Sequence, residues 1–148
     1  MPLSLHVDGE KWRSHLGAMV SAKPGLVPVI KGNGYGFGLA FLAAESTRLG
    51  LDAVAVGLAS EVAQVRTAFA GEIIVLSPDY AGNAELDSKV IQTVSSIEVL
   101  QSIDASATVI IEILTPLNRH GIDISDLNRT LAIVKDRALT LRGFTFHL

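Results

Sequence analysis

The part of this chain with the clearest chemistry is a lone lysine between an apolar run and a glycine-rich segment. Lys31 follows Val27-Pro28-Val29-Ile30 and precedes Gly32-Asn33-Gly34-Tyr35-Gly36-Phe37-Gly38. The short β-branched run predicts a buried strand, and alternating glycines let a backbone approach a ligand closely. A lysine buried there loses part of its preference for the charged form, so its amine can attack an aldehyde. Pyridoxal phosphate is the common aldehyde cofactor held this way, and Tyr35 offers a phenol for its phosphate.

Two other uses of a glycine-rich segment do not fit this spacing. A nucleotide-binding P-loop places its lysine after the glycines and follows it with Ser or Thr, whereas Lys31 precedes the glycines. A dinucleotide-binding fingerprint that starts at Gly32 requires glycine or alanine at its last position, where this chain has Phe37. One alternative stays open on the loop alone: Lys31 is an ordinary lysine that reaches solvent from a strand end, and the glycines form a flexible turn.

Three segments, in order along the chain, resemble the alanine racemase family. Residues 27–38, VPVIKGNGYGFG, are similar to the family's cofactor-lysine motif, usually written near V-V-K-A-N-A-Y-G-H-G. The resemblance implies that Lys31 forms the Schiff base with pyridoxal 5'-phosphate and acts as an acid/base at the α-carbon of the substrate. It also implies that Tyr35 binds the cofactor's phosphate.

The two later segments extend the resemblance. Residues 115–121, TPLNRHG, look like the family's T-G-M-N-R-L-G, which implies that Arg119 hydrogen-bonds the cofactor's phenolic oxygen, with Asn118 as a supporting neighbour. Residues 141–147, LRGFTFH, resemble the strand that bears the family's cofactor-side histidine, which implies a cofactor-binding role for His147. Three matches in the family's order are far more specific than any one of them.

Departures from the family pattern indicate a divergent member. The family's aspartate before the threonine, the glycine and methionine after it, and the histidine after Tyr-Gly are replaced here by Leu114, Pro116, Leu117 and Phe37. Glu112 stands where many alanine racemases carry a carbamylated lysine, so the resemblance implies a carboxylate that orients Arg119 with a shorter reach. The alternative for Glu112 is a polar residue on the solvent side of a strand.

Composition excludes several classes of function. A net charge of −3 without a long basic run argues against nucleic acid as a partner. The chain has no cysteine, which excludes disulfides and thiolate metal sites, and its four histidines lack ligand spacing, so no metal site is expected. Neither a membrane span nor a secretory signal is expected, and a cytoplasmic location follows by elimination only.

Strand and helix patterns alternate along the chain. We expect strands near 4–7, at 27–31, 53–57, 73–77, 91–94, 108–114 and 142–147, and helices at about 8–21, 39–49, 60–70, 97–105 and 125–136. Asp8 is the expected cap of the first helix, whose Trp12, Leu16, Met19 and Val20 share one face and are expected in the core. Turns are expected at Gly50, at Pro78-Asp79 and at residues 81–83, with Tyr80 at the surface or in packing.

This alternation predicts an α/β fold with a parallel sheet, and the resemblance makes it an incomplete (β/α)8 TIM-like barrel of the alanine racemase type with about six barrel strands. Lys31, Arg119 and His147 fall at strand carboxyl ends, where such barrels place their chemistry. We therefore expect residues 1–148 to be a partial cofactor-binding barrel domain, without the remaining strands and a C-terminal β-domain. The apolar fraction of 49% and the mean hydropathy of +0.41 then reflect apolar surface that the partial barrel leaves exposed. Association into a homo-oligomer is one way to bury that surface.

For the intact protein, the resemblance implies racemisation of a small amino acid, most simply L-alanine to D-alanine for the cell wall, with this piece inactive or nearly so. Two alternatives stay open. One is a non-catalytic pyridoxal phosphate-binding protein or an amino-acid decarboxylase of the same barrel family. The other is a folding or assembly fragment that binds no ligand.

Overall fold

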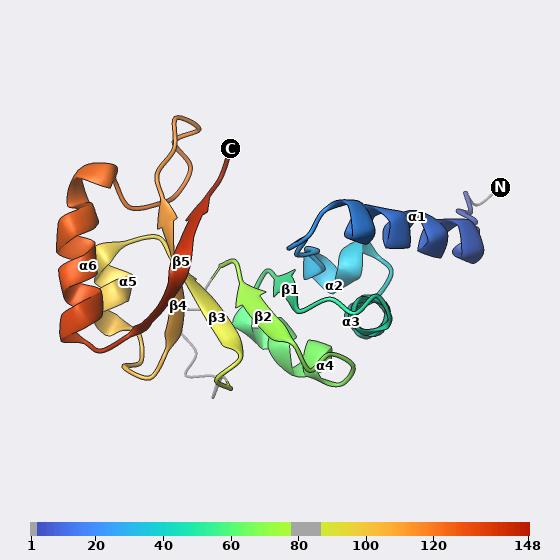
Figure 1. Cartoon of the computed structure of the whole chain (residues 1–148), viewed down its shortest axis with the longest axis horizontal. Helices are drawn as coiled ribbons and strands as arrows, with labels where there is room; N and C mark the ends of the chain where they lie inside the picture. The colour runs from blue at the N-terminus through green and yellow to red at the C-terminus, as the bar shows by residue number, and fades with distance from the viewer. Residues whose placement is uncertain (1–2, 78–86) are drawn as a thin grey trace.

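The core of the fold is a parallel sheet in which every strand lies next to its neighbours in sequence. The computed structural model describes residues 3–77 and 87–148. Its five-stranded sheet has the order β1-β2-β3-β4-β5, and all four strand pairs are parallel (Figure 1). The strands are β1 Ala53–Val56, β2 Glu72–Val75, β3 Val90–Val94, β4 Thr108–Ile113 and β5 Thr140–Phe146. This uninterrupted parallel order confirms the predicted α/β class and is that of an incomplete barrel.

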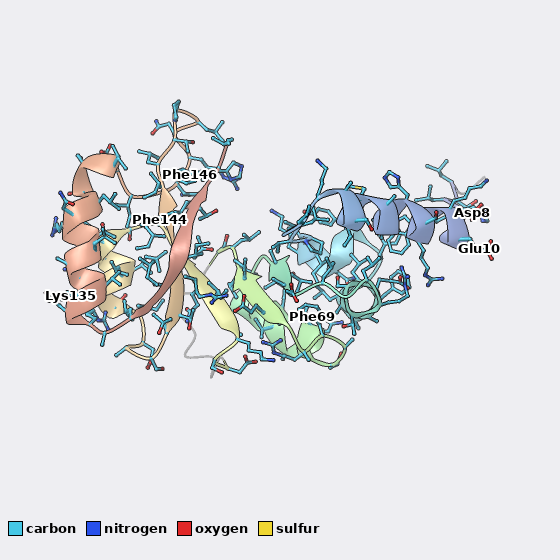
Figure 2. The ribbon with its side chains drawn as sticks, in the orientation of Figure 1. Asp8, Glu10, Phe69, Lys135, Phe144 and Phe146 are labelled. Carbon is cyan, nitrogen blue, oxygen red and sulfur yellow. The ribbon has the colours of Figure 1, made fainter. Side chains whose placement is uncertain are left out.

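Helices precede or connect the strands, and most of them pack against one face of the sheet. They are α1 Gly9–Ala22, α2 Lys31–Tyr35, α3 Leu39–Arg48, α4 Val62–Arg66, α5 Ile97–Ser102 and α6 Leu127–Asp136, with short 3-10 helices at Ala59–Glu61 and Ile124–Asp126. Asp8 caps α1 as predicted, because its Oδ1 accepts the Lys11 N–H at 3.1 Å; it lies at the free end of that helix (Figure 2). No helix in residues 3–77 and 87–148 combines the length and apolar character needed to cross a membrane.

The core has two parts, both on the helical face of the sheet. One joins β1 and β2 to α3 and α4, and Val54, Val56 and Ile73 are fully buried in it. The other joins β4 to α5 and α6, with Val109 and Ile111 fully buried. Side chains alternate along each strand, so the opposite face of β4 presents half-buried residues instead: Thr108, Ile110 and Glu112. That less buried face is the side that points inward in a closed barrel.

The first two expected strands differ from the prediction. Residues 4–7 pair with no strand in the described ranges, and Leu5 is 85% exposed there. The expected strand 27–31 is reduced to one parallel bridge between Val29 and Ala55. Pro28 has no N–H to donate, and the chain leaves the extended conformation at Lys31, so pairing cannot extend in either direction. The described sheet thus has five strands and one bridged position instead of about six strands.

The apolar face of α1 is less buried than predicted. Trp12, Leu16, Met19 and Val20 are half-buried, and α1 contains no fully buried residue. They line a hollow of about 140 Å³ that is shared with the segment before Lys31 and with one side of α3. The prediction that they are core residues is wrong because only one layer packs against this helix. Of the predicted turns, Gly50 has a left-handed φ of 67°, while Pro78-Asp79, Tyr80 and residues 81–83 lie outside the described residues.

Candidate functional site

Lys31 lies at the carboxyl end of the bridged segment, beside the end of β1. The bridge at Val29 places it on the β1 edge of the sheet, and Ile30, only 2% exposed, anchors the backbone before it. Lys31 itself is exposed. The expected burial of this lysine is therefore wrong for this structure, since no strand in the described ranges lies beyond Val29 to cover it.

The residues after Lys31 form a left-handed turn. Gly32, Asn33, Gly34 and Tyr35 have φ of 61°, 53°, 63° and 53°, all in the region that only glycine adopts without cost. Each non-glycine residue there costs roughly 1–2 kcal/mol, so the two glycines halve the strain of the turn. The turn leaves Tyr35 63% exposed, with its phenol accessible.

Short contacts hold this turn against α3 and α1. The Gly34 N–H donates to the Ile30 carbonyl at 3.1 Å, and the Gly38 N–H donates to the Asn33 carbonyl at 2.9 Å. A Cβ on Gly34 would lie 3.0 Å from Leu42 Cδ1, so the turn packs directly on α3. Farther along the loop, the Phe37 ring stacks on Trp12 of α1 with ring centroids 6.0 Å apart.

A glutamate that the sequence analysis missed joins this turn to the sheet. The Glu61 carboxylate accepts the Gly32 N–H at 2.8 Å, the Gly57 N–H at 2.6 Å and the Leu58 N–H at 3.0 Å. An acidic residue in the first helical turn after a strand is a local signal that could have identified Glu61 as a backbone acceptor. Its contact with Gly32, 29 residues away, has no such signal.

The loop after β4, residues 114–121, returns to the strand that it leaves. The Ile122 N–H donates to the Glu112 carbonyl at 2.8 Å, and the Leu114 N–H donates to the Ile122 carbonyl at 2.9 Å. Gly121 has a φ of 130°, and a Cβ there would lie 2.4 Å from the Leu114 nitrogen, so no other residue fits this closure. Asn118 has a left-handed φ of 53° at the tip of the loop.

This loop brings Arg119 to the end of β5. The Arg119 Nη1 lies 3.3 Å from His147 Nε2, and Thr115 Oγ1 donates to the His147 carbonyl at 2.5 Å. A guanidinium can only donate, so His147 Nε2 is the acceptor in this contact. Glu112 is half-buried on β4, and within the described residues no hydrogen bond or ion pair joins it to Arg119. The partner of Arg119 in this structure is His147.

The expected site residues thus form two groups at the carboxyl ends of the strands. Lys31 and Tyr35 lie beyond the bridged position beside β1, and Arg119 and His147 lie beyond β4 and β5. Because β1 and β5 are the two edge strands of the sheet (Figure 1), the two groups are apart in the described chain, and the side-chain contact among these four residues is that of Arg119 with His147. All four residues follow the carboxyl ends of strands, the edge that bears the active site in parallel barrels.

Comparison with known proteins identifies the family of this chain. A family model described as "Alanine racemase, N-terminal domain" matches residues 10–148. The alanine racemase of Campylobacter curvus is 29% identical over 119 residues, which cover 80% of this chain and 34% of that protein. The alanine racemase of Campylobacter concisus is 28% identical over 125 residues, covering 84% and 36% of the two chains. The chain therefore spans about a third of the length of these relatives.

Solved structures share the fold. The crystal structure of alanine racemase from Oenococcus oeni superposes with a TM-score of 0.77 at 26% identity, over 93% of this chain and 41% of that one. The enzyme from D-cycloserine-producing Streptomyces lavendulae gives a TM-score of 0.81 at 20% identity, over 94% and 41% of the two chains. Together with the family match, these similarities show that the chain belongs to the alanine racemase family, in the part called the N-terminal domain.

Proposed function

We propose that this chain supplies the cofactor-binding barrel part of a pyridoxal 5'-phosphate-dependent enzyme that racemises a small amino acid, alanine in the first instance. The observation that supports this most is Lys31 at a strand end, followed directly by the left-handed turn that presents Tyr35. The family match over residues 10–148 supports the reaction class, because alanine racemases are pyridoxal 5'-phosphate enzymes.

The residues at the site fit the chemical groups of this cofactor. Lys31 offers an amine for the aldehyde, and the Tyr35 phenol offers a hydrogen-bond donor for the phosphate. Arg119 offers a guanidinium for the phenolic oxygen, and His147 lies against it at 3.3 Å. Gly57 leaves room beside the lysine, since a Cβ there would lie 3.2 Å from Lys31 Cβ. Asn118 and Glu112 are proposed to support the Arg119 loop and the strand before it.

When bound, the cofactor withdraws electrons from the substrate's α-carbon, which makes its proton removable. In this proposal the Lys31 amine first holds the cofactor and then takes or returns that proton on one face of the α-carbon. Racemisation needs proton exchange on both faces, and Lys31 serves one. We therefore propose that the 148-residue chain turns over amino acids slowly or not at all, and that the complete enzyme is a homo-oligomer acting on an amino-acid substrate.

A second candidate is a pyridoxal phosphate-binding protein without turnover. The observation that favours it is the separation of Lys31 and Arg119 at opposite edges of the described sheet. A decarboxylase of the same barrel family is the catalytic rival. Release of carbon dioxide from an amino acid, in place of inversion at its α-carbon, would identify the decarboxylase.

Covalent labelling tests the proposed function directly. Pyridoxal 5'-phosphate followed by borohydride should attach to the peptide that contains Lys31, with a visible absorbance before reduction, and Lys31→Ala should abolish both. Lys23→Ala is the matched control, because Lys23 is an exposed lysine at the end of α1. Attachment to Lys11, Lys23, Lys89 or Lys135 in place of Lys31 would contradict the proposal.

A further inference from the structure

Both carboxylate oxygens of Glu61 accept hydrogen bonds from backbone N–H groups around Lys31. Oε1 accepts the N–H of Gly32, the residue directly after the lysine, at 2.8 Å. Oε2 accepts the N–H groups of Gly57 and Leu58, which end β1, at 2.6 Å and 3.0 Å. One side chain therefore joins the turn after the lysine to the end of the neighbouring strand.

The position of Glu61 is itself well defined. It ends the 3-10 helix Ala59–Glu61, and Ala59, Val62 and Val65 around it are buried in the core. The Gly57 carbonyl accepts the Ser77 N–H at 2.8 Å, so the strand end that Glu61 contacts is also fastened to β2. The carboxylate is therefore held in one position beside the end of β1.

Gly57 brings the lysine and the glutamate into close packing. A Cβ at this position would lie 3.2 Å from Glu61 Oε2, 3.2 Å from Lys31 Cβ and 3.7 Å from Lys31 Cδ. The stem of the lysine and the carboxylate therefore lie on the same side of Gly57, over the space where a side chain would be. The lysine stem therefore packs against Gly57, next to the carboxylate.

We propose that Glu61 is the positioning residue for Lys31, a role that rests on the proposed function of the lysine. Glycine has the largest conformational freedom of any residue, so the peptide between Lys31 and Gly32 needs an external restraint to hold one orientation. The hydrogen bond from the Gly32 N–H to Glu61 supplies that restraint. This restraint limits the orientations of the flexible Lys31 side chain before the cofactor binds, and such preorganisation favours an efficient reaction.

Glu61→Gln tests this role with almost no change of shape. An amide nitrogen cannot accept a hydrogen bond, so glutamine has one acceptor oxygen. It can accept from the Gly32 N–H or from the N–H groups of Gly57 and Leu58, but not from both sides. We expect the rate of pyridoxal 5'-phosphate and borohydride attachment at Lys31 to fall about tenfold, within the range known for displaced reacting groups. Amide hydrogen exchange in the cofactor-free chain should become faster at Gly32 or at Gly57. Glu61→Asp, which keeps both oxygens on a shorter stem, should recover part of the rate.

Asp87→Asn is the matched control. Asp87 also uses both oxygens, on Arg66 and on the Lys89 N–H, but it lies before β3 at the other end of the strands. It should lower thermal stability and leave the rate at Lys31 unchanged. Gly57→Ala is the second variant, because its Cβ would lie 3.2 Å from both Lys31 Cβ and Glu61 Oε2 and would push them apart while residue 61 is still glutamate. It should also slow attachment at Lys31.

The outcomes separate the two hypotheses. If the parent chain is not labelled at Lys31, the proposed function is wrong, and the positioning role falls with it. If the parent is labelled at Lys31 but Glu61→Gln is labelled at the parent's rate, the positioning role alone is overturned. A loss of rate in Glu61→Gln that Asp87→Asn matches would also overturn it, because the effect would then be one of stability.

Discussion

At the residue scale, one nearly buried carboxylate, Glu45, pairs with two arginines. Glu45 of α3 is 7% exposed and accepts from Arg13 of α1 at 2.7 Å and from Arg48 at 2.7 Å. Hydrogen bonds from these two guanidinium groups lower its pKa from 4.5 to about 2. Because Arg13 is on α1, this ion pair fastens the first helix to the third.

We predict that Glu45 makes the stability of the chain sensitive to acid. A carboxyl whose pKa is lower in the folded state stabilises it fully above the unfolded pKa near 4.5, and this contribution is lost as the pH falls toward 2. Glu45→Gln should lower the free energy of unfolding at pH 7 by about 2 kcal/mol and flatten its dependence between pH 5 and pH 2 by about the same amount. Urea titrations across this pH range, with Glu10→Gln on the exposed side of α1 as control, measure both effects. An unchanged pH slope in Glu45→Gln would contradict the assignment.

At the scale of elements, the left-handed turn after Lys31 is the local structure on which the proposed site depends. Its hydrogen bonds run within the turn and to Glu61, and Gly34 packs on α3 so closely that a Cβ would lie 3.0 Å from Leu42 Cδ1. Gly32 has the same left-handed backbone with nothing within 4 Å of its Cβ position. Alanine at Gly32 would therefore add backbone strain alone, whereas alanine at Gly34 would add backbone strain and a close contact with α3.

We predict different costs for alanine at these two positions. Gly32→Ala adds only the strain of a left-handed alanine and should lower stability by roughly 1–2 kcal/mol. Gly34→Ala adds the same strain and a contact of 3.0 Å with Leu42 Cδ1, so it should cost more. Chemical denaturation of both variants measures the difference, and the double variant Gly34→Ala with Leu42→Ala should recover the packing part. Equal losses for the two single variants would show that the turn does not pack on α3 as described.

At the scale of the whole molecule, both edges of the sheet are open in the described residues. β5 pairs only with β4, and β1 has one bridge to Val29 beyond its pairing with β2. Phe144 and Phe146 extend from β5 near its end (Figure 2), and they are 41% and 58% exposed. An unpaired edge with exposed aromatic residues favours pairing with another chain.

We predict that the 148-residue chain associates in solution through this edge. The apparent mass should rise with concentration in sedimentation or light-scattering measurements. Phe146→Lys should reduce association, since a lysine at an edge strand disfavours pairing. Leu117→Lys is the control, because Leu117 is 55% exposed in a loop and not on a strand. A monomer at all concentrations would contradict this prediction.

Local patterns in the sequence were sufficient for much of the fold. The strand and helix order from β1 onward and the Asp8 cap depend on residues within a few positions of one another, where periodicity and capping preferences are informative. The prediction of a strand at 27–31 was wrong, because strand pairing depends on a partner strand and on the backbone conformation from Lys31 onward. The prediction that α1 is buried was wrong, because amphipathic spacing indicates which face of a helix is apolar but not how many layers pack against that face.

The sequence by itself determined the family resemblance and the residues Lys31, Tyr35, Arg119 and His147 as candidates, because each belongs to a short motif with fixed spacing. Only the tertiary structure paired Arg119 with His147, 28 residues apart, and Gly32 with Glu61, 29 residues apart. Such contacts follow from the parallel register, which brings the carboxyl ends of successive strands to one edge of the sheet whatever the length of chain between them. Motif spacing therefore named the candidate reactive side chains, and strand register decided which backbone and side-chain groups lie against them.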